Sequence, residues 1–184
     1  MNYLCAGDGL TIKIFDTCCL ITLFETIGSC DIVQACESYE KIVTPEVKNE
    51  FGEGIHESIG ITSIQSLDNF SLFEGYRKAF PGIHQGEWSS IALAIWLNEK
   101  NDGNVVLVMD DQVGKRCINE LIKFDGVRKI YPNIDKLKVT GSIGLLKNMV
   151  KNGKLAQHFV QGIIQDLSNS DRWIPKDLVK SLSE

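Results

Sequence analysis

The sequence lacks the features that mark several common classes of protein. No apolar run approaches the length that crosses a bilayer, and the first residues have neither a basic n-region nor a long apolar h-region. We therefore expect no membrane contact and no secretory signal. None of the six cysteines forms a C-x-x-C pair or has a histidine at zinc-ligand spacing. Reduced thiols, several of them in the core, and a cytoplasmic location are expected.

Sequence motifs of nucleotide binding and of two phosphotransfer folds are also missing. The chain contains no G-x-x-x-x-G-K-[ST], and no G-x-G-x-x-G after a strand. A fold of the haloacid dehalogenase type needs a second Asp two residues after the Asp that ends its first strand. Here Asp16 is followed at that position by Cys18. A response-regulator receiver has its acidic pair after the first strand, whereas Asp110 and Asp111 come late in this chain.

The length and the charge distribution limit the remaining classes. With 184 residues, the chain is predicted to form a single domain over 1–184, with a C-terminal helical extension from about 150 to 184. The net charge of −5 argues against a general nucleic-acid binder. Residues 1–110 carry 6 basic and 16 acidic residues, whereas residues 111–184 carry 13 and 8. This segregation fits an acidic metal site beside a basic phosphate-contacting surface, and it fits chance segregation of surface charge equally well.

Apolar strand patterns and helical patterns alternate along the chain. The two strongest strand patterns lie within 11–17, where the apolar run stops at Asp16, and at 105–109, just before Asp110 and Asp111; a helix follows each. Weaker strands are predicted at 41–43, 61–65 and 137–139. Helices are predicted at 20–27, 29–38, from 45 past 50, and at 70–80, 85–100, 112–122, 145–151, 157–167 and 176–182. Residues 124–136 are predicted to be a loop with a possible short strand. This alternation predicts an α/β sandwich with a mainly parallel sheet.

Five carboxylates fall at positions that such a fold could bring together. Asp16 follows the first strong strand, Asp110 and Asp111 follow the second, Glu87 begins a buried helix, and Glu50 lies in the helix after a short strand. Taken singly, Asp110 is better explained as a helix cap and Glu50 as a solvated side chain, and Glu87 could be a partner of the helix dipole. Gathered at one place, like charges raise each other's pKa, and a divalent cation relieves this repulsion. Mg²⁺ prefers such oxygen ligands together with substrate phosphates.

Five blocks of sequence resemble, in order, the successive motifs of a PIN domain. The blocks are Ile14-Phe15-Asp16-Thr17, Pro45-Glu46-Val47-Lys48-Asn49-Glu50-Phe51, Gly86-Glu87-Trp88-Ser89-Ser90-Ile91-Ala92-Leu93-Ala94, Val106-Leu107-Val108-Met109-Asp110-Asp111 and Val139-Thr140-Gly141-Ser142-Ile143-Gly144-Leu145-Leu146. More narrowly, they resemble the prokaryotic branch related to VapC-type toxins and known as the DUF3368 group. The resemblance covers nearly the whole chain.

The resemblance implies a three-layer PIN-like sandwich and a Mg²⁺- or Mn²⁺-dependent ribonuclease. Many relatives are toxins of toxin–antitoxin pairs and form dimers. An RNA substrate, a cognate antitoxin protein and a homodimer are therefore expected. The resemblance leaves open a PIN-like module that binds RNA or protein without cutting it, and a nuclease directed at DNA.

The motif match also implies roles for individual residues. Asp16, Glu50 and Glu87 take the first three acidic positions of the family. The fourth falls at Asp110 or Asp111, of which Asp111 fits the general family spacing better. As a hypothesis, Asp16, Glu87 and one or both members of this pair hold the metal, while Glu50 completes the shell or orients the attacking water.

Contacts to the substrate are predicted outside the carboxylates. Thr17 and Thr140 match small hydroxyl positions that line such sites in the family. Because the N-terminal half is acidic, basic contacts to RNA are expected mainly from Lys115, Arg116 and the later lysines.

Overall fold

The centre of the molecule is a parallel sheet. The computed structural model describes residues 11–28, 31–36, 38, 40–52, 60–67, 71–171 and 174–183. Five strands pair in the order β3-β2-β1-β4-β5, and every pairing is parallel. The strands are β1 (Ile12–Phe15), β2 (Glu40–Val43), β3 (Ser63–Ile64), β4 (Val105–Val108) and β5 (Lys138–Thr140). The sheet confirms the predicted fold class, and it places the two strongest strand patterns, β1 and β4, side by side.

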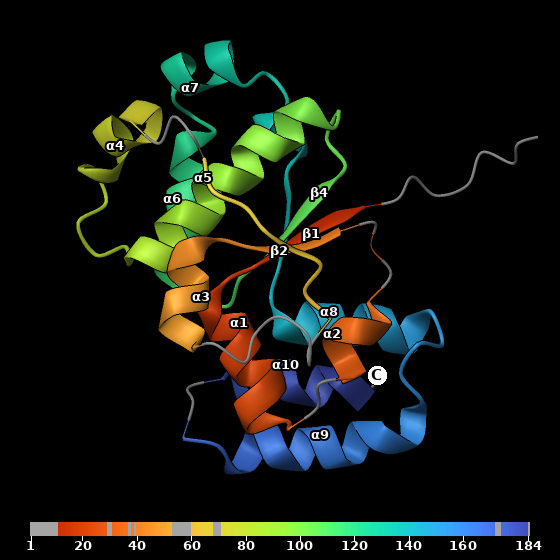
Figure 1. Cartoon of the computed structure of the whole chain (residues 1–184). Coiled ribbons are helices and arrows are strands. Elements are labelled where there is room, and N and C mark those ends of the chain that lie inside the picture. Colours follow the sequence, from red (N-terminus) through yellow and green to blue (C-terminus); the bar gives the residue numbers. More distant parts are fainter. Residues whose placement is uncertain are drawn as a thin grey trace, which may run out of the picture.

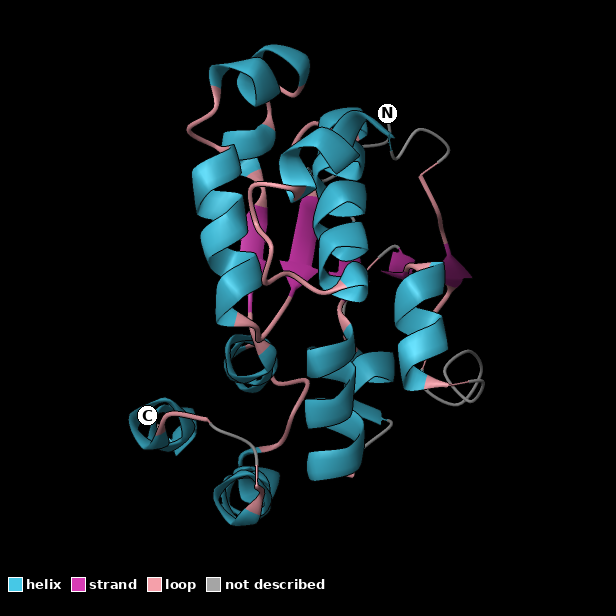
Figure 2. Ribbon diagram, turned by 90° about the vertical axis from the view of Figure 1, so that its left-hand side faces the viewer, coloured by secondary structure: helices cyan, strands magenta, loops and turns pink. Residues whose placement is uncertain are grey.

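Helices cover both faces of the sheet and complete a three-layer sandwich (Figure 1). One face carries α4 (Ser71–Arg77), α5 (Gln85–Lys100), α6 (Gln112–Leu121) and α7 (Asp125–Ile130). The other carries α1 (Thr17–Ile21), the π-helix Thr22–Thr26, α2 (Asp31–Ala35), α8 (Ser142–Lys151), α9 (Gln157–Asn169) and α10 (Lys176–Lys180). The remaining elements are α3 (Pro45–Phe51) and the 3₁₀ turns Ile134–Lys136 and Ser181–Ser183. Figure 2 shows the strands between these helices.

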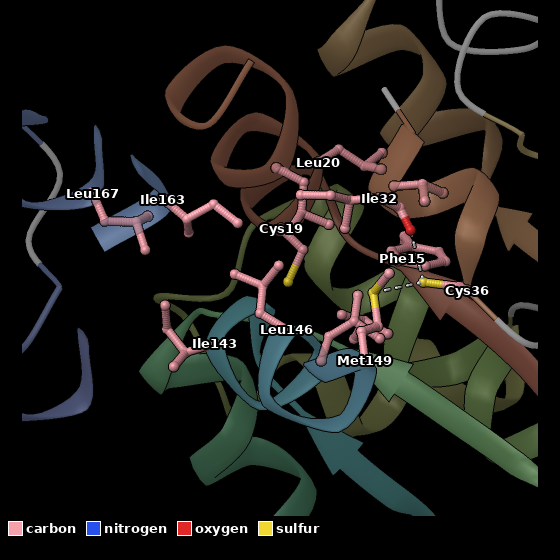
Figure 3. Close-up of a cluster of buried hydrophobic side chains, with 14 of the residues drawn as sticks. Phe15, Cys19, Leu20, Ile32, Cys36, Ile143, Leu146, Met149, Ile163 and Leu167 are labelled. Atoms are coloured by element: carbon pink, nitrogen blue, oxygen red, sulfur yellow. Dashed lines mark hydrogen bonds between the residues drawn. The ribbon is translucent and has the colours of Figure 1, made fainter. Parts of the chain in front are cut away.

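The alternation of side chains along β1 divides the apolar core into two parts. Ile12 and Ile14 pack under α5 and α6, whereas Phe15 points into the other part, with Leu20 and Leu146 (Figure 3). α5 is buried over nearly its whole length, as its apolar pattern predicts. Within the described residues, no helix combines the length and the hydropathy that a bilayer crossing requires. The two parts of the core pack against the two faces of the sheet. Because all its strands are parallel, their carboxyl ends share one edge.

Several predictions about local structure are wrong, among them the helix predicted at 20–27, which begins at Thr17 and becomes a π-helix at Thr22. Residues 124–136 were predicted to be a loop with a possible short strand, but they form α7 and a 3₁₀ turn. Val127 and Ile134 are buried there, and Phe124 stacks on Tyr76 with ring centroids 6.1 Å apart. These contacts come from distant elements, and six helical residues are too few for a recognisable period. The helix predicted at 145–151 begins three residues earlier, at Ser142.

Candidate functional site

Asp16 lies at the carboxyl end of β1 and is fully buried. Its backbone is extended, and its Oδ1 accepts a hydrogen bond from the backbone N of Cys19 at 2.9 Å, which caps α1. Its Oδ2 has no hydrogen-bond partner in the described part of the chain. Burial raises the pKa of Asp16 to about 7, opposed by the Cys19 hydrogen bond and reinforced by the charges of Asp110 and Glu87. The site is therefore built around a costly buried carboxyl group.

Asp110 lies beyond the neighbouring strand and is held by hydroxyl and amide donors. Its Oδ1 accepts a hydrogen bond from the backbone N of Ser142 at 2.8 Å. Its Oδ2 accepts one from Ser142 Oγ at 2.6 Å and one from Thr22 Oγ1 at 3.1 Å. Thr22 begins the π-helix, a form of helix often found at functional sites. These bonds tie the start of α8 to Asp110 and explain why that helix begins early.

Asp111 faces a different neighbour from Asp110. Its Oδ1 accepts a hydrogen bond from the backbone N of Gly114 at 2.7 Å and caps α6. Its charge raises the pKa of Glu87, whereas the charge of Asp110 raises the pKa of Asp16. The two adjacent acids therefore have different hydrogen-bond partners, Asp110 at the start of α8 and Asp111 at the start of α6.

Glu87 occupies the first turn of α5 and is only 8% exposed. Its Oε2 accepts a hydrogen bond from the backbone N of His84 at 3.0 Å. Burial raises the pKa of Glu87; the His84 hydrogen bond opposes this, and the charges of Asp111 and Glu50 add to it. Glu87 is therefore close enough to both Glu50 and Asp111 to interact with their charges.

Glu50 is exposed, but donors from two other helices hold it. Its Oε2 accepts a hydrogen bond from Thr17 Oγ1 at 2.5 Å, and its Oε1 accepts one from the backbone N of Gly86 at 3.1 Å. α3 begins at Pro45, as predicted, and Thr44 caps it. The buried hydroxyls of Thr44 and Ser89 lie 2.7 Å apart and fasten α3 to α5. Glu50 is thereby placed at the edge where α1, α3 and α5 begin or meet.

The position of Glu50 makes Gly86→Ala an informative substitution. A Cβ at Gly86 would lie 2.5 Å from Glu50 Oε2 and 2.8 Å from Oε1. The exposed Glu50 side chain can move away, so we expect a change in melting temperature of only a few degrees. The RNA cleavage that the sequence resemblance implies should fall by roughly tenfold or more, because Glu50 leaves its place. The measurement is a turnover assay beside a thermal melt.

Gly162→Ala in α9 is the matched control for this substitution. A Cβ at Gly162 meets no atom within 4 Å, so the same helical Gly-to-Ala change occurs away from the acids. Full activity in the Gly86→Ala variant would contradict a role for Glu50.

The free oxygen atoms of the cluster fit a hard divalent cation. Asp16 Oδ2, Glu87 Oε1 and Asp111 Oδ2 receive no hydrogen bond from any described residue, while the other oxygen of each carboxylate is anchored. No three Asp, Glu, His or Cys side chains in the described ranges lie close enough to form a compact ligand group. Carboxylate oxygens of this kind suit a hard divalent cation that is held partly through its own waters.

The predicted substrate-binding residues occupy different places. Lys115 and Thr140 line a pocket beside Asp110. Thr17 lies at Glu50, to which it donates its hydrogen bond. Arg116 is exposed on α6 and is not among the residues that line this pocket. The structure thus brings Lys115, Thr140 and Thr17 to the acidic cluster and leaves Arg116 outside it.

Sequence reasoning missed three residues that hold the acids in place. Ser142 and Thr22 both donate to Asp110, and the backbone of Gly86 donates to Glu50. Ser142 carries a weak signal, as a hydroxyl two residues after Thr140. Thr22 has none, because the sequence does not reveal that the π-helix turns it toward a residue 88 positions later.

Comparison with known proteins gives one family match. A family model described as a PIN domain matches residues 12–184. No curated protein and no solved structure matches. The matched span contains every carboxylate of the cluster.

Proposed function

Because this chain belongs to the PIN-domain family, we propose that it is a metal-dependent ribonuclease that hydrolyses phosphodiester bonds in RNA with Mg²⁺ or Mn²⁺. The family is generally one of nucleases, which supports hydrolysis of a nucleic acid. The observation that carries the proposal is the set of three anchored carboxylates, Asp16, Glu87 and Asp111, each with one oxygen that accepts no hydrogen bond from a described residue. The nearby Lys115 supplies positive charge for a phosphate.

Each residue of the site has a separate task in this proposal. Asp16, Glu87 and Asp111 would hold the ion, directly or through waters. When bound, such an ion lowers the pKa of water and stabilises the charge that develops in an in-line displacement at phosphorus. Glu50, fixed by Thr17 and Gly86, orients the attacking water. Asp110 completes the cluster. The products would carry a 5′-phosphate and a 3′-OH.

The finer biological role follows from the sequence resemblance. The blocks that resemble the VapC-related branch support a role as the toxin of a toxin–antitoxin pair. In this proposal the enzyme acts as a homodimer, and a cognate antitoxin protein inhibits it.

Cleavage of a labelled panel of single-stranded RNAs and DNAs tests the proposed activity. We expect RNA to be cut with Mn²⁺ or Mg²⁺ and to remain intact with EDTA. Cleavage of DNA but not of RNA would show that the protein is a DNA-directed nuclease and not a ribonuclease. A folded protein that cuts no member of the panel and binds no Mn²⁺ would instead be a non-catalytic RNA- or protein-binding module.

A further inference from the structure

A groove lined by lysines runs over the sheet face that α8 covers, between β1, β5, α8 and the residues that follow α2. Its floor is apolar, and the sulfur atoms of Cys36 and Met149 meet there at 3.9 Å (Figure 3). No described Asp or Glu lines it. The five lysines that define this lysine groove are Lys13, Lys138, Lys147, Lys151 and Lys154. It therefore combines an apolar floor with walls of a single charge.

Part of the positive charge of the lysine groove has no acidic residue near it in sequence. Residues 136–165 contain five lysines and no acidic residue. Lys138, Lys147 and Lys151 form no ion pair with any described residue. Lys147 and Lys151 lie four residues apart on α8, a spacing at which like charges destabilise a helix. The helix dipole stabilises the positive charge of Lys151 in the last turn of α8. It does not stabilise Lys147, in the middle of the helix, or Lys138, on β5. Such a surface attracts a polyanion.

The lysine groove adjoins the pocket that Asp110 and Asp111 line. Thr140 and Gly144 line both the groove and the pocket beside Asp110. α8 connects the two places, because Ser142 at its start binds Asp110 and its last residue is Lys151. At 1.5 Å per residue, these two ends are roughly 14 Å apart. A strand whose phosphate enters the pocket can therefore extend along the groove.

We propose that the lysine groove binds the sugar–phosphate backbone of the RNA on one side of the cleaved bond, several nucleotides away from it. This inference rests on the proposed ribonuclease function and specifies where its substrate lies. Thr140 and Gly144 line both the groove and the pocket beside Asp110. This shared lining favours the substrate strand, and not an acidic protein segment, as the molecule that the groove binds. Binding here is electrostatic, so it recognises an RNA backbone without reading its sequence.

The double variant Lys147→Gln/Lys151→Gln tests this placement. In EDTA, we expect it to bind a fluorescent single-stranded RNA on the order of tenfold more weakly than wild type. The slope of log K against log salt concentration should become shallower by about 1.4, because each lost phosphate contact contributes about 0.7 for a single strand. With metal, the ratio of kcat/KM for a long RNA to that for a dinucleotide should fall in parallel.

Lys78→Gln/Lys129→Gln provides the matched control, since it removes the same charge at two exposed lysines outside the groove. Equal RNA affinity and an equal salt slope in the two double variants would overturn the proposal. So would a groove variant that loses binding of poly-glutamate but keeps its RNA affinity. Because binding is measured in EDTA, the groove and the nuclease are tested separately. Weakened RNA binding in a groove variant of a protein that cuts no RNA and binds no Mn²⁺ supports the groove and contradicts the nuclease.

Discussion

Replacing Asp16 by asparagine is expected to lower the rate of RNA cleavage by on the order of 10³-fold while leaving the fold intact. Asparagine is as good a helix cap as aspartate, so the hydrogen bond from Cys19 can persist. The substitution removes the negative charge, and a neutral amide oxygen is a weaker ligand for a hard cation than a carboxylate oxygen. The measurement is the single-turnover rate with saturating Mn²⁺, beside a circular dichroism spectrum.

Asp102→Asn is the matched control for this experiment. Asp102 is exposed and has a φ of 50°, a backbone region that asparagine tolerates well. It lies in the turn before β4, at the opposite end of that strand from Asp110. The control should keep its activity. An Asp16→Asn variant that cleaves RNA as fast as Asp102→Asn would refute the assignment of Asp16.

The same substitution is expected to stabilise the metal-free protein above about pH 7. The pKa of Asp16 is about 7 in the folded state, against an ordinary value of 3.8. Between these values the folded protein holds a proton that the unfolded chain has released, so stability falls as pH rises from about 4 to about 7. At 1.36 kcal/mol per pKa unit, the loss is about 4 kcal/mol. Asp16→Asn has no such loss and should be the more stable protein in EDTA at neutral and alkaline pH.

Denaturant unfolding in EDTA across this pH range measures the effect. The free energies of wild type and Asp16→Asn should diverge as pH rises, and the gap should stay constant once Asp16 is ionised. Asp102→Asn should follow the wild type throughout. Parallel curves for wild type and Asp16→Asn would show that the Asp16 carboxyl is not destabilised by burial. A site residue that weakens the fold in this way is a common cost of function.

The parts of the fold that could be predicted are those with strong local patterns. The apolar runs of β1 and β4 and the long apolar helix α5 dictate their own structure, and the predicted bounds of α5 agree with the observed ones. Their order places Asp16 and Asp110 at neighbouring strand ends, because parallel strands share one carboxyl edge. α7 was missed because its helix is short and depends on contacts with α4.

The division of labour between Asp110 and Asp111 could not be read from sequence. Two adjacent acids at a strand end have the same local pattern, and each is a reasonable helix cap. Their roles differ because Ser142 and Thr22 reach Asp110 from α8 and the π-helix, while Asp111 turns to Gly114. These partners depend on how the two sides of the sandwich meet, which only the folded chain decides.

Direct titration with Mn²⁺, followed by electron paramagnetic resonance, tests most directly whether the carboxylate cluster is a metal site. Wild type should bind the ion, and its affinity should fall at least about tenfold in Asp16→Asn and in Asp111→Asn. Asp102→Asn should bind as wild type does. Failure of the folded wild-type protein to bind Mn²⁺, or unchanged affinity in the Asp16→Asn variant, would contradict a metal centre at this edge of the sheet.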